Sequence, residues 1–308
     1  CTAYCIWLVN YIDWLYGSAD DIGHAQMKLK NPEAEIFIPD NVPESKAFER
    51  TTHMGISAHQ DDLEIMAYHG ILECFGREQN HFFGVTVTDG AGSPRDDIYA
   101  GYSDEQMKRV RKLEQKKAAV VGEYSGMALL NYSSADVKSP GNTSVKEELK
   151  ELFRHARPTH IYTHNLADKH DTHVAVALKT IQALRELPAE EKPKFLYGCE
   201  VWRNLDWMPD EDKVVFDVSG HENLAASLLG VFDSQIRGGK RYDLATMGRR
   251  RSNATYFSSH GTDRATGLIF AMNLTPLIAD PGLDIIDFVS SHMDKFAGEV
   301  KSKLKNLI

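Results

Sequence analysis

Segments typical of buried strands alternate with segments typical of helices from residue 54 onward, and this order constrains the fold more than any other feature of the sequence. The expected strands are short apolar or β-branched runs over 54–58, 81–88, 127–132 and 159–164. The expected helices follow them in turn, over 63–75, 104–122, 145–156 and 172–187. Such alternation is typical of a parallel sheet that carries helices on both faces. The sequence therefore predicts an α/β protein with a Rossmann-like, mostly parallel sheet.

The two ends of the chain are less regular. Residues 195–202 and 214–218 are expected as later strands, and 284–307 as a terminal helix. The stretch 237–264 is rich in Gly and Arg and has weak periodicity, so we predict long loops there. This pattern divides the chain into an N-terminal extension over 1–50, expected as an aromatic helix and a loop, and an α/β domain over 51–308. The α/β domain is expected to be rich in loops from about residue 200.

Composition excludes several classes of protein. The chain has 308 residues, with 35 basic and 44 acidic side chains and a net charge of −9, which argues against a nucleic acid partner bound on a basic surface. The longest apolar run, around 267–272, is shorter than the roughly 20 residues of a membrane span. The first residues lack the basic start of a signal peptide, so we expect a cytoplasmic location. The four cysteines form no CxxC pair, and Cys74 is expected as a buried free thiol.

Histidines and aspartates gather at the carboxyl ends of two predicted strands. The first cluster spans 58–64 and contains His59, Asp61 and Asp62, and the second spans 164–173 and contains His170 and His173. Sheets of this type place their ligand outside the carboxyl ends of the strands. Imidazole and carboxylate groups from two loops suit a divalent metal of the zinc type. Either cluster alone would also fit a helix N-terminus with an incidental histidine, but the pair of clusters favours a metal site.

The adjacent acids Asp61 and Asp62 suit two different roles. Two neighbouring carboxylates cannot both face a metal in the same way, so one can be a ligand while the other accepts a proton from metal-bound water. On the facing loop, His170 and His173 are three residues apart at a helix start, so they can share one face.

These segments resemble the LmbE / PIG-L family of zinc-dependent N-acetylglucosaminyl de-N-acetylases. Residues 58–62 (AHQDD) resemble the family's AHPDD segment, and 170–173 (HDTH) resemble its HPDH-like segment. Weaker similarities lie at 87–92 (VTDGAG), 111–119 (an R-x-x-E-x-x-x-A helix) and 233–235 (DSQ). The resemblance covers roughly residues 54–235, and it implies that residues 51–308 form an LmbE-like deacetylase domain.

The resemblance also implies a role for each residue. His59, Asp62 and His173 would be the ligands of a Zn²⁺ ion. Asp61 would be the general base and later the acid that protonates the departing amine, and His170 would stabilise the oxyanion. The implied activity is removal of an N-acetyl group from a small N-acetylglucosamine-type sugar conjugate.

Two positions depart from the family pattern and keep alternatives open. Gln60 replaces a proline, and Asp171-Thr172 replaces Pro-Asp, so the acid that supports the zinc histidine has moved. Asp168 could supply that support instead. The alternatives are a non-catalytic carbohydrate-binding descendant of the family and a metal hydrolase of another amide or of a phosphoester. Assembly into a homo-oligomer is also left open.

Two groups of charged residues could be ordinary surface charges or could contact the substrate. Arg111 and Glu114 are three residues apart on a helix, which predicts a surface ion pair, with contact between Arg111 and substrate as the alternative. Residues 249–251 are three consecutive arginines. Such a run is usually solvated, although it could meet an anionic group of the substrate.

Overall fold

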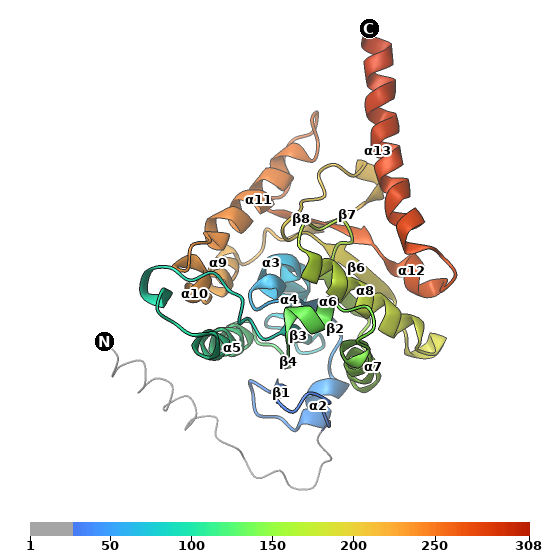
Figure 1. Cartoon of the computed structure of the whole chain (residues 1–308). Helices are drawn as coiled ribbons and strands as arrows, with labels where there is room; N and C mark the ends of the chain where they lie inside the picture. Colours follow the sequence, from blue (N-terminus) through green and yellow to red (C-terminus); the bar gives the residue numbers. More distant parts are fainter. Residues whose placement is uncertain (1–26) are drawn as a thin grey trace.

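The protein is an α/β sandwich built on one eight-stranded sheet (Figure 1). The computed structural model describes residues 27–308. The strands, in chain order, are β1 (Glu35–Phe37), β2 (His53–Ser57), β3 (Phe82–Thr88), β4 (Gly126–Tyr132), β5 (His160–His164), β6 (Phe195–Cys199), β7 (Lys213–Asp217) and β8 (Leu268–Asn273). They lie side by side in the order β1-β4-β3-β2-β5-β6-β8-β7. The prediction of a mostly parallel sheet is confirmed.

The sheet is parallel in its centre and antiparallel at its edges. The pairs β3–β4, β2–β3, β2–β5 and β5–β6 are parallel. At one edge β1 runs antiparallel to β4, and at the other β8 runs antiparallel to both β6 and β7. The chain moves from β2 to β3 on one side and later returns to β5 on the other side of β2. The carboxyl ends of β2 and β5 therefore flank the switch point, where ligands of such sheets bind.

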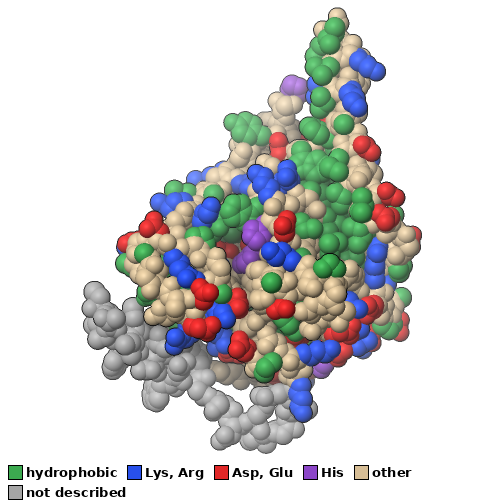
Figure 2. All heavy atoms as spheres, in the orientation of Figure 1, with side chains coloured by type: hydrophobic (Ala, Val, Ile, Leu, Met, Phe, Trp, Pro, Cys, Tyr) green, Lys and Arg blue, Asp and Glu red, His purple; other side chains and the backbone are tan. Residues whose placement is uncertain are grey.

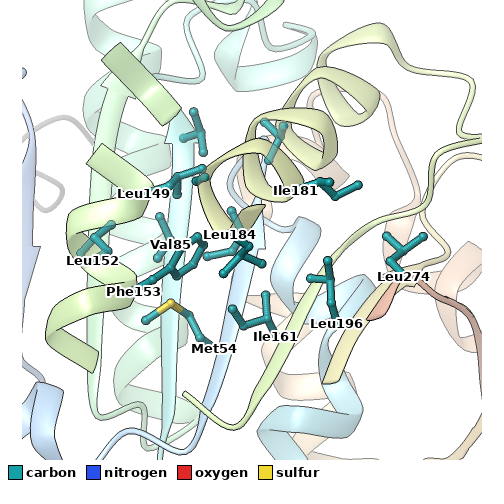
Figure 3. Packing of buried hydrophobic residues seen from close by; sticks show 14 of the residues in the cluster. Met54, Val85, Leu149, Leu152, Phe153, Ile161, Ile181, Leu184, Leu196 and Leu274 are labelled. Carbon is teal, nitrogen blue, oxygen red and sulfur yellow. The ribbon is translucent and has the colours of Figure 1, made fainter. Parts of the chain in front are cut away.

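Helices cover both faces of the sheet and pack on two apolar clusters. One face carries α2 (Glu44–Glu49), α6 (Ser134–Lys138), α7 (Ser144–Ala156), α8 (Asp171–Arg185) and α12 (Thr275–Ala279). The other face carries α3 (Asp62–Met66), α4 (Tyr68–Cys74), α5 (Asp104–Val121) and α9 (Glu222–Gly230). Figure 3 shows side chains of α7 and α8, such as Phe153 and Leu184, against strand residues Met54, Val85 and Ile161. The central strands β2, β3 and β4 are buried on both sides, so their sequences are rich in apolar residues.

Most of the predicted elements are confirmed, but two predictions are wrong. The single helix expected over 63–75 is divided at Ala67 into α3 and α4. The prediction of long loops over 237–264 is wrong for most of that stretch, because Tyr242–Tyr256 form the helix α11. The short helix α10 (Asp233–Ile236) precedes it.

The terminal helix is confirmed as α13 (Ile285–Leu307), whose N-cap Asp284 accepts hydrogen bonds from the backbone N–H groups of Ile286 and Asp287. Its C-terminal half projects away from the body (Figure 1). Cys74 is a buried free thiol, as expected, and so is Cys199. The aromatic helix expected near the N-terminus lies outside the described residues. Among residues 27–308, no helix is long and apolar enough to cross a membrane.

Candidate metal centre and active site

Two loops meet at the switch point and line a cavity of about 320 Å³. The loop after β2 brings His59, Asp61 and Asp62 to this cavity, and the loop after β5 brings His170. His173 is fully buried on the first turn of α8, behind His170. Histidine side chains are visible in a hollow of this face of the molecule, with acidic and basic side chains beside them (Figure 2). The structure therefore brings together all five residues that the sequence indicated.

Three of these residues place metal-ligating atoms at mutual contact distances. His59 Nδ1 lies 3.2 Å from Asp62 Oδ2 and 3.1 Å from His173 Nε2, and His173 Nε2 lies 3.3 Å from Asp62 Oδ2. Ligand atoms about 2.1 Å from a tetrahedral zinc ion are separated by about 3.3 to 3.4 Å. One cation accounts for all three distances at once, whereas a single proton satisfies only one pair. The donor set present in this chain therefore fits a zinc ion.

His170 lies beside this triad, and its nitrogen could complete a second set with His59 and His173. The ring of His170 lies 4.9 Å from that of His59 and 4.7 Å from that of His173, centroid to centroid. Burial and the two neighbouring imidazoles lower the pKa of His170 to about 4, so its ring is neutral near pH 7. A neutral imidazole still has one N–H to donate. The geometry alone thus allows His170 either to donate a hydrogen bond or to bind metal.

His164, the last residue of β5, belongs to the site but was missed as a site residue by sequence reasoning. Its Nε2 accepts a hydrogen bond of 2.8 Å from the backbone N–H of Ala58 and lies 3.5 Å from Asp62 Oδ2. Its ring stacks on that of His173, with 3.9 Å between centroids. Asp62, His164 and His173 also bring ligating atoms close enough together to hold one ion, but Nε2 of His164 already accepts from Ala58 and is poorly placed to bind a metal. His164 therefore connects the two loops and stacks on His173, a candidate metal-ligating residue.

Asp61 occupies a strained position that keeps one carboxylate oxygen available. Its φ is +93°, in the left-handed region, and its backbone N–H donates to Gln115 Oε1 at 3.2 Å. Its Oδ2 has no hydrogen-bond partner, and Arg111 Nη1 lies 3.6 Å away. Burial raises the pKa of Asp61, and the guanidinium of Arg111 opposes that rise. A buried carboxylate with raised proton affinity beside a cavity suits a general base.

Asp62 has the opposite electrostatic environment from its neighbour. Although burial opposes it, His173, His164 and His59 together hold the pKa of Asp62 well below its usual range. Asp62 Oδ2 also accepts the backbone N–H of His59 at 2.7 Å. Asp62 therefore stays ionised, as a ligand must, while Asp61 binds a proton more readily. The two roles expected for the adjacent acids match these two environments.

Gln60, which departs from the family pattern in the first loop, is held in place by hydrogen bonds of its side chain and its backbone. The side-chain amide of Gln60 donates to the carbonyl oxygen of Thr88 at 3.0 Å, and the backbone carbonyl of Gln60 accepts from Arg111. Gly90 makes room for this side chain, since a Cβ there would lie 2.6 Å from Gln60 Oε1. These bonds replace the rigidity that a proline would give to the turn.

Arg111 and Glu114 are not a surface ion pair, so that expectation is wrong. Both are buried, and they hold two different segments near the site. Arg111 binds the loop of Gln60 and Asp61, as described above. Glu114 accepts hydrogen bonds from the backbone N–H and the hydroxyl of Ser234, at 2.7 and 2.6 Å. Helix α5 thus connects the first loop to the 233–235 segment, which had appeared in the sequence as a separate similarity.

Asp168, rather than Asp171, lies beside His173, the candidate metal ligand for which the sequence had left the supporting acid open. Its Oδ1 lies 3.5 Å from His173 Nδ1 and accepts the backbone N–H of His170 at 2.9 Å. Its Oδ2 accepts the backbone N–H of Trp202 at 3.0 Å. Asp171, in contrast, is exposed at the start of α8. A carboxylate facing the distal nitrogen of a ligand histidine orients the ring and increases its basicity.

We therefore expect Asp168→Asn to weaken zinc binding by about 10- to 100-fold, because the charge that faces His173 is lost while the side-chain volume is kept. Competition with a chromophoric chelator measures this affinity. Asp171→Asn, an exposed acid of the same loop, is the matched control and should bind zinc as the unaltered chain does. Equal zinc affinities in the two variants would exclude the supporting role of Asp168.

The fold and the site define an α/β protein with a candidate zinc centre at the switch point of its sheet. Residues 54–184, which include both site loops, match the PIG-L family, described as GlcNAc-PI de-N-acetylase. The resemblance seen in the motifs is thus confirmed over residues 54–184. No curated protein shows a significant match to the chain.

Solved structures with the same fold cover nearly three quarters of this chain. GalB, the 4-carboxy-2-hydroxymuconate hydratase of Pseudomonas putida, is 13% identical, with a TM-score of 0.55 over 73% of this chain and 95% of its own. The conserved protein TT1542 of Thermus thermophilus is 15% identical, with a TM-score of 0.57 over 75% and 98%. The N,N'-diacetylchitobiose deacetylase of Pyrococcus horikoshii is 17% identical, with a TM-score of 0.54 over 72% and 83%. At these identities the similarity establishes the fold.

Proposed function

We propose that this chain is a zinc-dependent hydrolase that removes the N-acetyl group from an N-acetylglucosamine-type sugar conjugate. The observation that carries the proposal is the juxtaposition at one cavity of the His59–Asp62–His173 triad and the Oδ2 atom of Asp61, which accepts no hydrogen bond. When bound to the triad, zinc would polarise the amide carbonyl and lower the pKa of water toward about 7.

The chain's own residues then supply the proton transfers. Asp61 takes a proton from the water that attacks the acetyl carbon, and it later gives that proton to the nitrogen as the C–N bond breaks. The neutral ring of His170 donates its N–H to the oxygen that becomes negatively charged. The products are acetate and a free amine. Arg111 is a positioning residue, since its contacts with Gln60 and Asp61 orient the base.

The comparisons support hydrolysis of an N-acetyl group but leave the reaction to be measured. The family is named for a de-N-acetylase, and one neighbour in fold is a diacetylchitobiose deacetylase. GalB, however, is a hydratase on a similar fold. Trp202 and Tyr242 line the cavity and offer aromatic faces to a sugar ring, with polar atoms at their edges.

The test is acetate release by the purified protein from the methyl glycoside of N-acetylglucosamine and from N,N'-diacetylchitobiose. We expect one free amine for each acetate, at a rate that falls when a chelator removes zinc and returns when zinc is restored. Binding of the sugar without acetate release would favour the carbohydrate-binding alternative. Release of a different acid from a panel of N-acyl substrates, with none from the acetyl compounds, would favour the hydrolase of another amide.

A further inference from the structure

The three consecutive arginines of α11 have different environments. Arg251 is exposed and lies 3.8 Å from Glu222 on the surface. Arg249 and Arg250 instead line a second cavity of about 150 Å³, which we call the arginine cavity. Arg250 is only 4% exposed. The exposure to solvent that the sequence predicts for these arginines is therefore found only for Arg251.

The arginine cavity adjoins the cavity of the candidate metal centre. The two cavities share the side chains of Ile65, Val201, Trp202 and Tyr242 in their walls. Tyr242 lies close enough to the metal centre that, after burial, the charges of Asp61 and Asp62 raise the pKa of its hydroxyl. A ligand held at the metal centre can therefore extend one of its groups toward the arginines.

Arg250 is a buried cation without a counter-ion among the described residues. Its Nη2 donates to the backbone carbonyls of Glu64 and Ile65, at 2.7 and 3.3 Å, and its guanidinium lies 4.4 Å from the ring centre of Tyr68. Its Nε has no hydrogen-bond partner. Charged side chains are seldom fully buried unless they are paired, because burial removes their hydration. An unpaired buried guanidinium in a cavity wall indicates a site for an anion.

Arg249 and Glu200 complete the charges of this cavity and leave it positive. Arg249 donates to the carbonyl oxygen of Val201, and no carboxylate of the described chain lies within ion-pair distance of it. Glu200 Oε1 accepts from the backbone N–H of Leu205, and its Oε2 accepts from Asn253 and from the backbone N–H of Phe270. One carboxylate, already engaged in three hydrogen bonds, thus faces two guanidinium groups.

Positive charge predominates in the lining of both cavities, although the whole chain carries a net charge of −9. The side chains that line them include the five cations Arg111, Lys138, Lys240, Arg249 and Arg250, against the three carboxylates Asp61, Asp62 and Glu200. A zinc ion would add two positive charges. A concave site lined by an excess of one sign attracts ligands of the other sign.

We propose that the arginine cavity binds an anionic group, a carboxylate or a phosphate, carried by the sugar substrate. The proposal rests on the proposed function, because it places the reacting amide at the candidate metal centre in the adjoining cavity. A cavity of about this size accommodates benzene in another protein, so a phosphate or a short carboxylate fits. Guanidinium groups are well suited to both anions, since they donate two hydrogen bonds in one plane.

The test compares neutral and anionic sugars on the zinc-loaded protein. The neutral substrate is the methyl glycoside of N-acetylglucosamine. The anionic substrates are N-acetylglucosamine 1-phosphate, N-acetylglucosamine 6-phosphate and N-acetylmuramic acid, which distinguish phosphate from carboxylate. We expect kcat/KM to be about 10- to 100-fold higher for at least one anionic sugar. Equal values for all four substrates would overturn the proposal even if acetate is released.

The variant Arg249→Gln removes the charge and keeps an amide that can donate to the Val201 carbonyl. It should abolish the preference for the anionic sugar, measured as the ratio of the kcat/KM values for the anionic and the neutral substrate. Arg251→Gln, the adjacent exposed arginine, is the matched control and should keep the preference. A preference that survives Arg249→Gln would also overturn the proposal. Arg250 is left unaltered because its bonds to the end of α3 contribute to the fold.

Calorimetric binding of glucosamine and glucosamine 6-phosphate separates this proposal from the proposed function. Binding needs no turnover, so a protein that releases no acetate still reports on the arginine cavity. Tighter binding of the phosphate sugar, lost in Arg249→Gln and kept in Arg251→Gln, supports the anion site whether or not the chain is a deacetylase. Equal binding of both sugars by the unaltered chain argues against it.

Discussion

The variant Asp61→Asn should bind zinc as tightly as the unaltered chain and lose about 10²- to 10⁴-fold in kcat, the usual contribution of a general base. Asparagine fills the same volume and tolerates the left-handed backbone at this position, so the loop should keep its shape. Only the ability to take the proton from water is removed. Metal analysis and acetate release, measured on the same preparation, check both halves of the expectation.

The variant Asp171→Asn serves as the control for charge, since it removes an exposed carboxylate from the facing loop. It should retain zinc and most of the activity. Full activity in Asp61→Asn would exclude Asp61 as the base and would require another group to accept the proton. Loss of zinc in Asp61→Asn would instead mean that Asp61 is a ligand.

The variants His173→Ala and His170→Ala are expected to show whether the metal is held by His59, Asp62 and His173 or by His59, His170 and His173. His173 contributes Nε2 to the triad and is oriented by Asp168, so His173→Ala should lower the zinc content from about one ion per chain to near zero. His170 lies outside that triad. His170→Ala should therefore keep its zinc and lose about 10²- to 10³-fold in kcat, as expected for removal of one oxyanion donor.

Zinc content and circular dichroism of both variants decide the outcome. Retention of zinc by His173→Ala in a folded protein would contradict the triad. Loss of zinc by His170→Ala would indicate that His59, His170 and His173 hold the ion together, the second arrangement that the structure allows. In that case the oxyanion would need a different donor.

The fold could be predicted from the sequence because the central strands are buried on both faces. The strand Phe82–Thr88, for example, consists of apolar and β-branched residues apart from Gly84, and the helices between the strands are amphipathic. Helix α11 could not be predicted in the same way. Its buried positions are Thr246, Arg250 and Asn253, which are polar, so its inner face carries no hydrophobic periodicity.

The site residues that carry chemistry were visible because they stand in short motifs at strand ends, but their supporting partners were not. His164 acts through a hydrogen bond to the backbone of Ala58, in the loop after β2, and no sequence pattern reports such a bond. The only signal was its position as the last residue of β5. Arg111 and Glu114 show the same limit, since their spacing fits an ion pair while each binds a distant segment. Long-range polar contacts depend on how the loops are brought together.

The left-handed backbone of Asp61 has a consequence for how such a chain could change over generations. A side chain held in that region costs about 1 to 3 kcal/mol, which glycine would not incur. The fold therefore bears a conformational penalty at the residue that is proposed to take the proton from water. Replacement of Asp61 by glycine would remove this penalty, but it would also leave the buried guanidinium of Arg111 without the carboxylate beside it, and breaking a buried pair costs about 3 to 5 kcal/mol. The strained carboxylate is thus retained by the arginine next to it, even in a chain that no longer needs turnover.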